Sequence, residues 1–102
     1  MIARIWRGVA PSANADAYDQ HFTTNVAPHL KTIAGHKGAW LLRRDTKGGV
    51  EFLAVTLWDS LESIKRFAGP DPEIAIVEPE ARDALSSFDD VVRHFEVAYS
   101  AI

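Results

Sequence analysis

Hydrophobic and polar residues alternate in two stretches of the chain, residues 2–9 and residues 91–99, which is the pattern of a β-strand with one face in a core. Two further stretches between them are also predicted to form strands, and the residues of 50–58 look buried on both faces. Residues 38–44 and 50–58 flank a short loop, 45–49, whose Asp and paired glycines are typical of a hairpin. The pattern therefore predicts four strands, two of them joined as a hairpin.

Two other stretches have the 3.6-residue spacing of an amphipathic helix. The first begins at Asn14 and runs to Pro28, whose ring and missing N–H end or kink a helix. The second follows Asp59, which the pattern predicts as its N-cap with a Glu three residues on, and a Gly-Pro pair stops it. Residues 71–90 predict only short helical pieces. The two apolar stripes are Ala15, Tyr18, Phe22 and Val26, then Leu61, Ile64, Phe67 and Ala68.

The order β-α-β-β-α-β predicts one ferredoxin-like α+β domain over residues 1–102, with a four-stranded antiparallel sheet and both helices on one face. Alternation divides the strand residues into two sets. We expect the aliphatic set, which includes Ile5, Val55 and Val97, to lie under the helices. The other set is too apolar to face water, so we predict a homodimer packed sheet to sheet. That set is Ile2, Arg4, Trp6, Phe52, Ala54, Thr56, Trp58, His94 and Glu96.

Composition limits the classes of function. A chain of 102 residues, 47% hydrophobic and 25% charged, fits a single soluble globular domain. Its net charge of −3 argues against nucleic acid or an anionic membrane as the main partner. The absence of cysteine excludes disulfides, thiolate catalysis and cysteine-based metal sites. We see no signal peptide and no run long enough to span a membrane, so a cytoplasmic location is expected.

Candidate chemistry lies in the last predicted strand, where His94 and Glu96 share one face. In the ferredoxin-like order this strand lies beside the first, so Arg4 becomes a cross-strand neighbour. A histidine in a partly dry pocket is an efficient general base. In this hypothesis His94 is the proton acceptor, Arg4 holds the resulting anion and Glu96 orients the histidine. The alternative is a structural network that satisfies buried polar groups and fixes the dimer.

Four residues of the same face form a candidate wall for a flat substrate, although aromatic residues at alternate strand positions also pack cores and interfaces. These substrate-binding candidates are Trp6, Phe52, Thr56 and Trp58. Trp40 could join either face, because the hairpin loop leaves the strand register open.

The remaining histidines, His21, His29 and His36, match no metal-ligand spacing. We therefore expect no metal site, and we predict surface or loop positions for all three.

Three segments resemble the antibiotic biosynthesis monooxygenases, a family of dimeric α+β-barrel proteins: IARIWRG near the start, FLAVTLWDSLESIKRFAG in the middle and RHFEV near the end. The most specific part is the Trp-Asp-Ser junction before the amphipathic helix. The resemblance covers nearly the whole chain and implies a two-subunit barrel with one pocket per subunit. The family includes oxygenases of polycyclic aromatic polyketides that use neither metal nor flavin, heme-degrading enzymes and quinol oxygenases.

The sequence departs from the heme-degrading branch, which has an Asn on the first strand, a Trp on the second helix and an iron-binding His soon after it. Here the first strand has no Asn, Phe67 occupies the helix position, and the segment EIAIVEP has no histidine. Heme degradation by that mechanism is therefore disfavoured, while heme binding through another histidine stays open.

The resemblance implies a cofactor-independent monooxygenase that binds a small aromatic or quinol-like molecule between sheet and helices and reacts it with dioxygen. The alternative is a non-catalytic small-molecule-binding or structural dimer.

Overall fold

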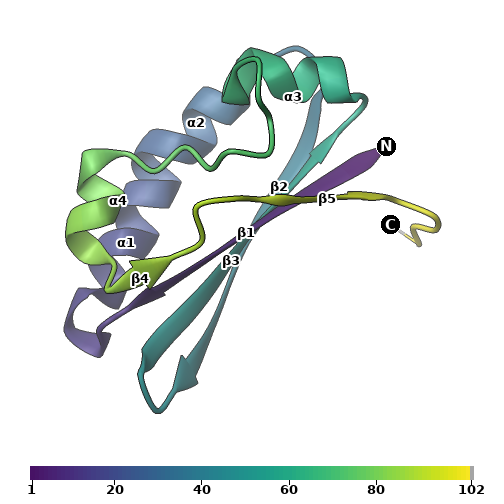
Figure 1. Cartoon of the computed structure of the whole chain (residues 1–102). Helices are drawn as coiled ribbons and strands as arrows, with labels where there is room; N and C mark the ends of the chain where they lie inside the picture. The colour runs from purple at the N-terminus through teal and green to yellow at the C-terminus, as the bar shows by residue number, and fades with distance from the viewer. Residues whose placement is uncertain (102) are drawn as a thin grey trace.

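The computed structural model, which describes residues 1–101, has an antiparallel sheet with helices on one face only (Figure 1). The predicted ferredoxin-like α+β order is confirmed, with α4 and β4 added before the last strand. The strands are β1 (Ile2–Ala10), β2 (His36–Thr46), β3 (Gly49–Trp58), β4 (Ser87–Phe88) and β5 (Arg93–Glu96). The helices are η1 (Ser12–Asn14), α1 (Ala15–His21), the π-helical η2 (Phe22–Val26), α2 (Ala27–Leu30), α3 (Leu61–Ala68) and α4 (Pro79–Ala84).

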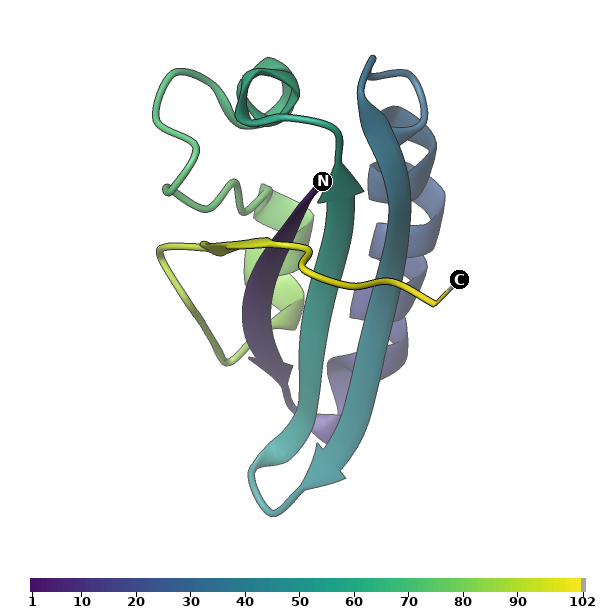
Figure 2. The same ribbon diagram turned by 90° about the vertical axis from the view of Figure 1, so that its right-hand side faces the viewer.

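The sheet has the order β2-β3-β1, and both β4 and β5 pair with the free edge of β1. The register places Arg4 opposite Thr56 of β3 on one side and opposite His94 of β5 on the other. The predicted neighbourhood of Arg4 and His94 is therefore confirmed. Figure 2 looks onto the face that carries no helix, and the described chain ends on that side of the sheet.

The first helical run does not stop at Pro28, where the sequence predicts an end or a kink. Its turns widen instead into the π-helical η2, and the N–H of Ala27 bonds to the carbonyl of Phe22, five residues back. An α-helical ladder would be interrupted here, because Pro28 lacks an N–H and its ring clashes with the preceding turn. The wider turn accommodates the proline, and the helical run continues to Leu30. The π-helical segment begins directly after His21.

Helix α3 begins one residue later than the sequence predicts. Ser60, and not Asp59, is its N-cap, with Oγ accepting a hydrogen bond from the Ser63 N–H at 3.2 Å. The Asp59 carboxylate accepts hydrogen bonds from the hydroxyls of Ser60 and Ser63. The Asp59 N–H donates to the carbonyl of Gly35 at 2.8 Å, which ties the start of α3 to the loop before β2.

The helices cover the opposite face from the one predicted. Phe52 and Trp58 are fully buried, and Arg4 and Thr56 are buried with them. Most of the residues predicted to form the uncovered dimer face therefore lie under the helices, although Glu96 is exposed, and aliphatic residues such as Val55 lie on the open side. Alternation fixes which residues share a face, but both sets are apolar, so it does not say which set the helices cover. Large aromatic rings lie underneath because their burial removes the most apolar surface from water.

The uncovered face is nevertheless apolar. Trp40 pairs with Val55, which places it on this face, and its exposed fraction is 42%. Leu42 and Phe95 are similarly exposed, at 48% and 51%. Half-buried aliphatic residues fill the space between them: Ala3, Ile5, Leu53, Val55 and Leu57. An open sheet surface of this composition is typical of an interface.

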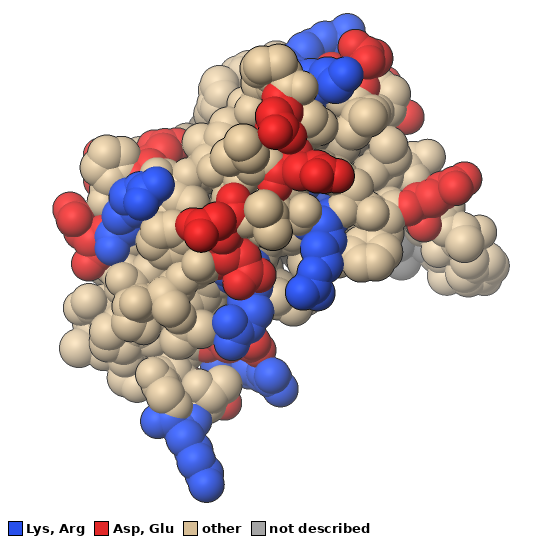
Figure 3. Space-filling model, viewed as in Figure 1, with Lys and Arg blue, Asp and Glu red and all other residues tan. Residues whose placement is uncertain are grey.

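Charged side chains of both signs are interspersed on the side of the molecule that Figure 3 shows, so no single charge dominates it. Several are paired. Arg7 and Arg44 both contact Glu51, and Arg43 of β2 contacts two aspartates of α1. Within the described residues, no helix is both long and apolar enough to cross a membrane.

Candidate functional site

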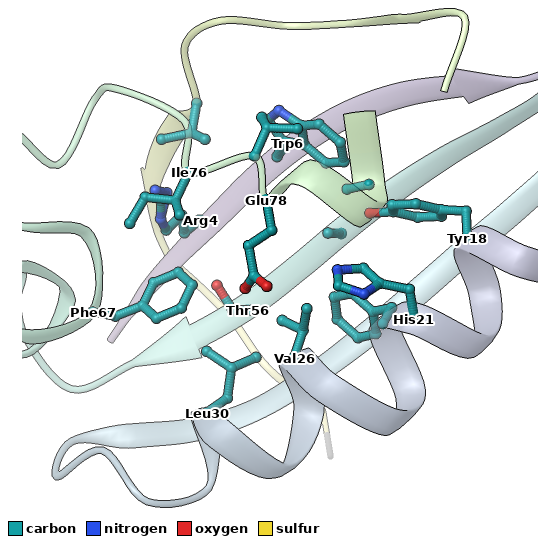
Figure 4. Close-up of a pocket in the computed structure, with 15 residues that line it drawn as sticks. Arg4, Trp6, Tyr18, His21, Val26, Leu30, Thr56, Phe67, Ile76 and Glu78 are labelled. Atoms are coloured by element: carbon teal, nitrogen blue, oxygen red, sulfur yellow. The ribbon is translucent and has the colours of Figure 1, made fainter. Parts of the chain in front are cut away.

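A cavity of about 80 Å³ lies between the sheet and the helices. Strands β1 and β3 form its floor, α1, η2 and α2 one wall, and α3 with the segment leading into α4 the rest (Figure 4). At about 30 Å³ per water, it admits roughly three water molecules. Most of its lining is apolar. The polar side chains that line it are Arg4, Trp6, Tyr18, His21, Thr56 and Glu78.

Arg4 is a buried cation with few partners. Only 5% of the residue is exposed, and burial lowers the pKa of its guanidinium to about 10. Its Nη2 donates to the carbonyl of Ile74 at 3.5 Å, while Nε is buried without a hydrogen-bond partner in the described chain. The guanidinium carbon lies 5.7 Å from the ring centre of Phe67. No carboxylate among the described residues forms an ion pair with Arg4, so its guanidinium has no direct anionic partner.

Glu78 supplies the negative charge of the cavity. It is exposed and immediately precedes α4, and its side chain extends inward so that the carboxylate lies between Phe67 and His21 (Figure 4). The carboxylate forms no ion pair with a described residue and makes no cap hydrogen bond to its own helix. Glu78 therefore brings a carboxylate from the solvent-exposed rim into the cavity.

His21 lies on the opposite wall, where α1 passes into the π-helical η2. It is 9% exposed, and its Nδ1 is 3.0 Å from the amide nitrogen of Asn25, one turn later. Because that amide nitrogen is a donor, Nδ1 accepts and the neutral ring carries its proton on Nε2. The prediction that His21 has a surface or loop position is wrong. The missed signal is its place three residues after Tyr18, on the same buried helical face.

The aromatic part of the lining is held rigidly. The Trp6 indole N–H donates to the carbonyl of Asp89 at 2.8 Å, which fixes the ring beside the cavity. A Cβ at Gly8 would lie 2.8 Å from the Trp6 ring, so the glycine makes room for it. The ring of Tyr18 packs against Phe52 with centroids 4.7 Å apart, and burial raises the pKa of the Tyr18 phenol.

The predicted substrate-binding residues separate into two groups. Trp6 and Thr56 line the cavity, whereas Phe52 and Trp58 lie in the core next to it. Thr56 Oγ1 accepts a hydrogen bond from the Trp58 indole at 2.8 Å. Trp58 also stacks on Phe67, with ring centroids 6.0 Å apart, so it supports the cavity wall from behind.

The predicted catalytic residues separate as well. His94 lies beside Arg4 in the sheet but is not part of the cavity lining. Its Nε2 is buried without a hydrogen-bond partner in residues 1–101, and burial, followed by the charge of Arg4, lowers the pKa of the imidazole. Glu96 is exposed and forms no ion pair with any described residue. The roles of Arg4, His94 and Glu96 stay predictions.

No group of three or more His, Cys, Asp or Glu in the described chain is arranged to hold a metal ion. No known protein-family model matches the sequence, and no curated protein matches it. Solved structures, in contrast, match nearly the whole chain. A proposed antibiotic biosynthesis monooxygenase from Caulobacter crescentus aligns with a TM-score of 0.72 and 17% identity, covering 96% of this chain and 90% of that one.

The chain has the fold of the antibiotic biosynthesis monooxygenases. Two further structures with this fold come from proteins of stated activity. SnoaB from Streptomyces nogalater, a cofactor-independent oxygenase, has a TM-score of 0.69 at 16% identity, over 98% of this chain and 95% of that one. The heme-degrader MhuD from Mycobacterium tuberculosis, with two hemes in its active site, has a TM-score of 0.70 at 21% identity, over 99% of each chain. At these identities the likeness shows the fold alone.

Proposed function

We propose that this protein is a cofactor-independent oxygenase that binds a small aromatic or quinol-like molecule in the cavity and reacts it with dioxygen. The observation that best supports the proposal is Arg4, a buried guanidinium without an ion pair in the described chain, at a cavity whose lining is mostly apolar. An arrangement of this kind suits a flat molecule that becomes anionic during reaction. SnoaB, which has the same fold, is a cofactor-independent oxygenase.

The reaction that this arrangement fits begins with an acidic CH₂ group flanked by aromatic rings, as in an anthrone. Loss of one proton gives an anion whose charge spreads onto the ring carbonyl oxygen, and the guanidinium of Arg4 would stabilise that oxygen. The anion passes one electron to dioxygen, and the two radicals combine to a peroxide. Loss of water then leaves a ketone. The sum, CH₂ + O₂ → C=O + H₂O, balances without an external reductant.

The remaining lining would serve this chemistry by excluding water. The rings of Trp6, Tyr18 and Phe67 surround the cavity, and a dry environment strengthens the attraction between Arg4 and a developing anion.

Oxygen uptake with anthrone tests the proposal. We expect wild type to consume oxygen and Arg4→Met to be about 10²–10³-fold slower in kcat. The exposed arginine Arg66, which lies outside the cavity, gives the matched control Arg66→Met. Equal rates for Arg4→Met and wild type would refute the role of Arg4.

Non-catalytic binding of a small molecule is the second candidate, because the cavity holds only part of a substrate with several rings. A volume of about 80 Å³ is modest for an enzyme pocket, so a substrate with several rings would have to extend past the exposed rim residues Ile76 and Glu78. A heme is larger still and would lie mostly outside this cavity, so we propose no heme chemistry. Quenching of the tryptophan fluorescence by anthrone without oxygen uptake would favour binding over catalysis.

We also propose that two copies associate through their uncovered sheet faces. The support is the run of apolar side chains on that face, including the exposed Trp40, Leu42 and Phe95. Apolar patches of this extent on monomers are uncommon and usually serve an interface. The cavity lies on the other side of the sheet, so such a dimer would leave both cavities open.

A further inference from the structure

We propose that Glu78 is the proton acceptor of the reaction, so that the acidic C–H of the substrate faces Glu78 while its carbonyl oxygen faces Arg4. This inference rests on the proposed function and adds to it the identity of the base. It departs from the sequence-based hypothesis, in which His94 takes the proton, because His94 does not line the cavity.

Most polar groups that line the cavity cannot act as the base, because they already form hydrogen bonds or carry a proton. The Trp6 indole N–H donates to the carbonyl of Asp89, and Thr56 Oγ1 accepts from the Trp58 indole. The phenol of Tyr18 has a raised pKa because it is buried, so it remains protonated and acts as a donor. Arg4 is a cation and cannot accept a proton. Among the described residues that line the cavity, His21 and Glu78 are left as candidates for the base.

The hydrogen bond between His21 and Asn25 decides between the two candidates. Nδ1 of His21 is 3.0 Å from the amide nitrogen of Asn25, so the lone pair of Nδ1 is occupied and the ring proton lies on Nε2. In this tautomer His21 can donate a hydrogen bond from Nε2, but it has no free lone pair with which to take a proton from a ligand. The imidazole thus adds a donor to the cavity and leaves the carboxylate as its acceptor.

Glu78 is placed to take a proton and to pass it on. Its carboxylate projects into the cavity between Phe67 and His21, and no described cation pairs with it (Figure 4). Arg4 lines the same cavity without forming an ion pair with Glu78, so the carboxylate is not held in a direct contact with the guanidinium. The residue is also exposed, which gives the proton a route to water.

The proton transfer can be written in full with Glu78 and Arg4 alone. The C–H bond breaks, its proton forms an O–H bond with the Glu78 carboxylate, and the electron pair moves into the ring system. The negative charge ends on the carbonyl oxygen, which the guanidinium of Arg4 stabilises. The proton on Glu78 later leaves with the water that is formed from the peroxide. A substrate with a proton-bearing carbon at one end and a carbonyl oxygen at the other matches this pair of charges.

Hydrogen exchange at the acidic carbon isolates this step from oxygenation. Anthrone is incubated in D₂O without oxygen, and loss of its CH₂ signal is followed by NMR, relative to buffer alone. We expect wild type to accelerate the exchange and Glu78→Gln to reduce that acceleration about 10²–10⁴-fold. Glu80→Gln is the matched control, because Glu80 is an exposed carboxylate two residues on that does not line the cavity. Equal acceleration by Glu78→Gln and wild type would overturn the inference.

Ligand binding gives a second readout. Quenching of the tryptophan fluorescence, to which Trp6, Trp40 and Trp58 all contribute, should show that Glu78→Gln still binds anthrone, so that its loss of exchange is the loss of the proton acceptor. Loss of anthrone binding together with loss of exchange in Glu78→Gln would contradict the assignment of Glu78 as the base.

Failure of the inference can be told apart from failure of the proposed function. Oxygen uptake that survives in Glu78→Gln overturns the base and leaves the oxygenase standing. Exchange that requires Glu78, with no oxygen uptake by wild type, supports the base and contradicts the oxygenase. Wild type that neither exchanges nor consumes oxygen with anthrone overturns both.

Discussion

The guanidinium of Arg4 lies 5.7 Å from the ring centre of Phe67, and no carboxylate of the described chain forms an ion pair with it. A cation in such a place is costly, because burial removes water and the aromatic ring compensates only in part. Residues that lower stability in this way are common at functional sites, where activity requires an arrangement that folding alone would not favour.

Replacing Arg4 by a neutral side chain of similar length should therefore stabilise the protein. We expect Arg4→Met to raise the free energy of unfolding by about 1–3 kcal/mol, measured by urea denaturation, because it removes a poorly solvated charge and retains the apolar stem. Arg7→Met removes a partly exposed ion pair with Glu51, which keeps Arg44 as a partner, and should change the same quantity by less than about 1 kcal/mol. A marked loss of stability in Arg4→Met would mean that the arginine is structural.

Stability should fall as the pH is lowered below about 6.5. Burial lowers the pKa of both His94 and His36 in the folded protein. As the pH falls through the usual histidine range, the unfolded chain takes up protons before the folded one does, so the free energy of unfolding decreases. Urea denaturation at pH 7.5 and 5.5 measures the difference.

The double variant His36→Gln/His94→Gln should lose less stability over the same interval, since glutamine does not titrate. The lowered pKa values of Glu51 and Asp59 act at more acidic pH and do not enter this window. If the free energy of unfolding decreases equally in wild type and in the double variant, the pH dependence does not come from His36 and His94.

A charge at the centre of the uncovered sheet face should prevent self-association. Val55 pairs with Ile5 on one side and with Trp40 on the other, so Val55→Arg places a cation in the middle of the apolar surface. We expect light scattering to give the mass of two chains for wild type and the mass of one chain for Val55→Arg. Thr24→Arg, on an exposed position of the helical run, should remain dimeric. Wild type that is monomeric at micromolar concentration would exclude the proposed dimer.

Gly35 should resist substitution because of both its backbone and its neighbours. Its φ is +93°, and a Cβ there would lie 2.0 Å from Ser63 Oγ and 2.5 Å from Asp59 Oδ1. Gly35→Ala should therefore destabilise the protein by more than about 1 kcal/mol in thermal or urea unfolding. Gly48 has no neighbour within 4 Å of such a Cβ, so Gly48→Ala should stay within about 0.5 kcal/mol of wild type. Equal effects of the two substitutions would refute this account of the turn.

The order of the elements was predictable because strand alternation and helical spacing are local signals, and the approach of His94 to Arg4 followed from the topology. The covered face was not predictable, because both faces of the strands are apolar and only the packing of Phe52 and Trp58 beneath the helices decides it. Glu78 gave no sequence signal: it stands in an irregular segment whose path depends on tertiary contacts.

Isotope labelling tests the central claim most directly. Wild-type protein is incubated with anthrone under ¹⁸O₂, and the product is analysed by mass spectrometry beside a reaction without protein. If the cavity supports cofactor-independent oxygenation, the protein will accelerate formation of anthraquinone that carries one ¹⁸O atom, with one O₂ consumed per anthrone, and Arg4→Met will largely abolish the acceleration. Anthraquinone formed no faster than in buffer, or equally fast with Arg4→Met, would contradict the claim.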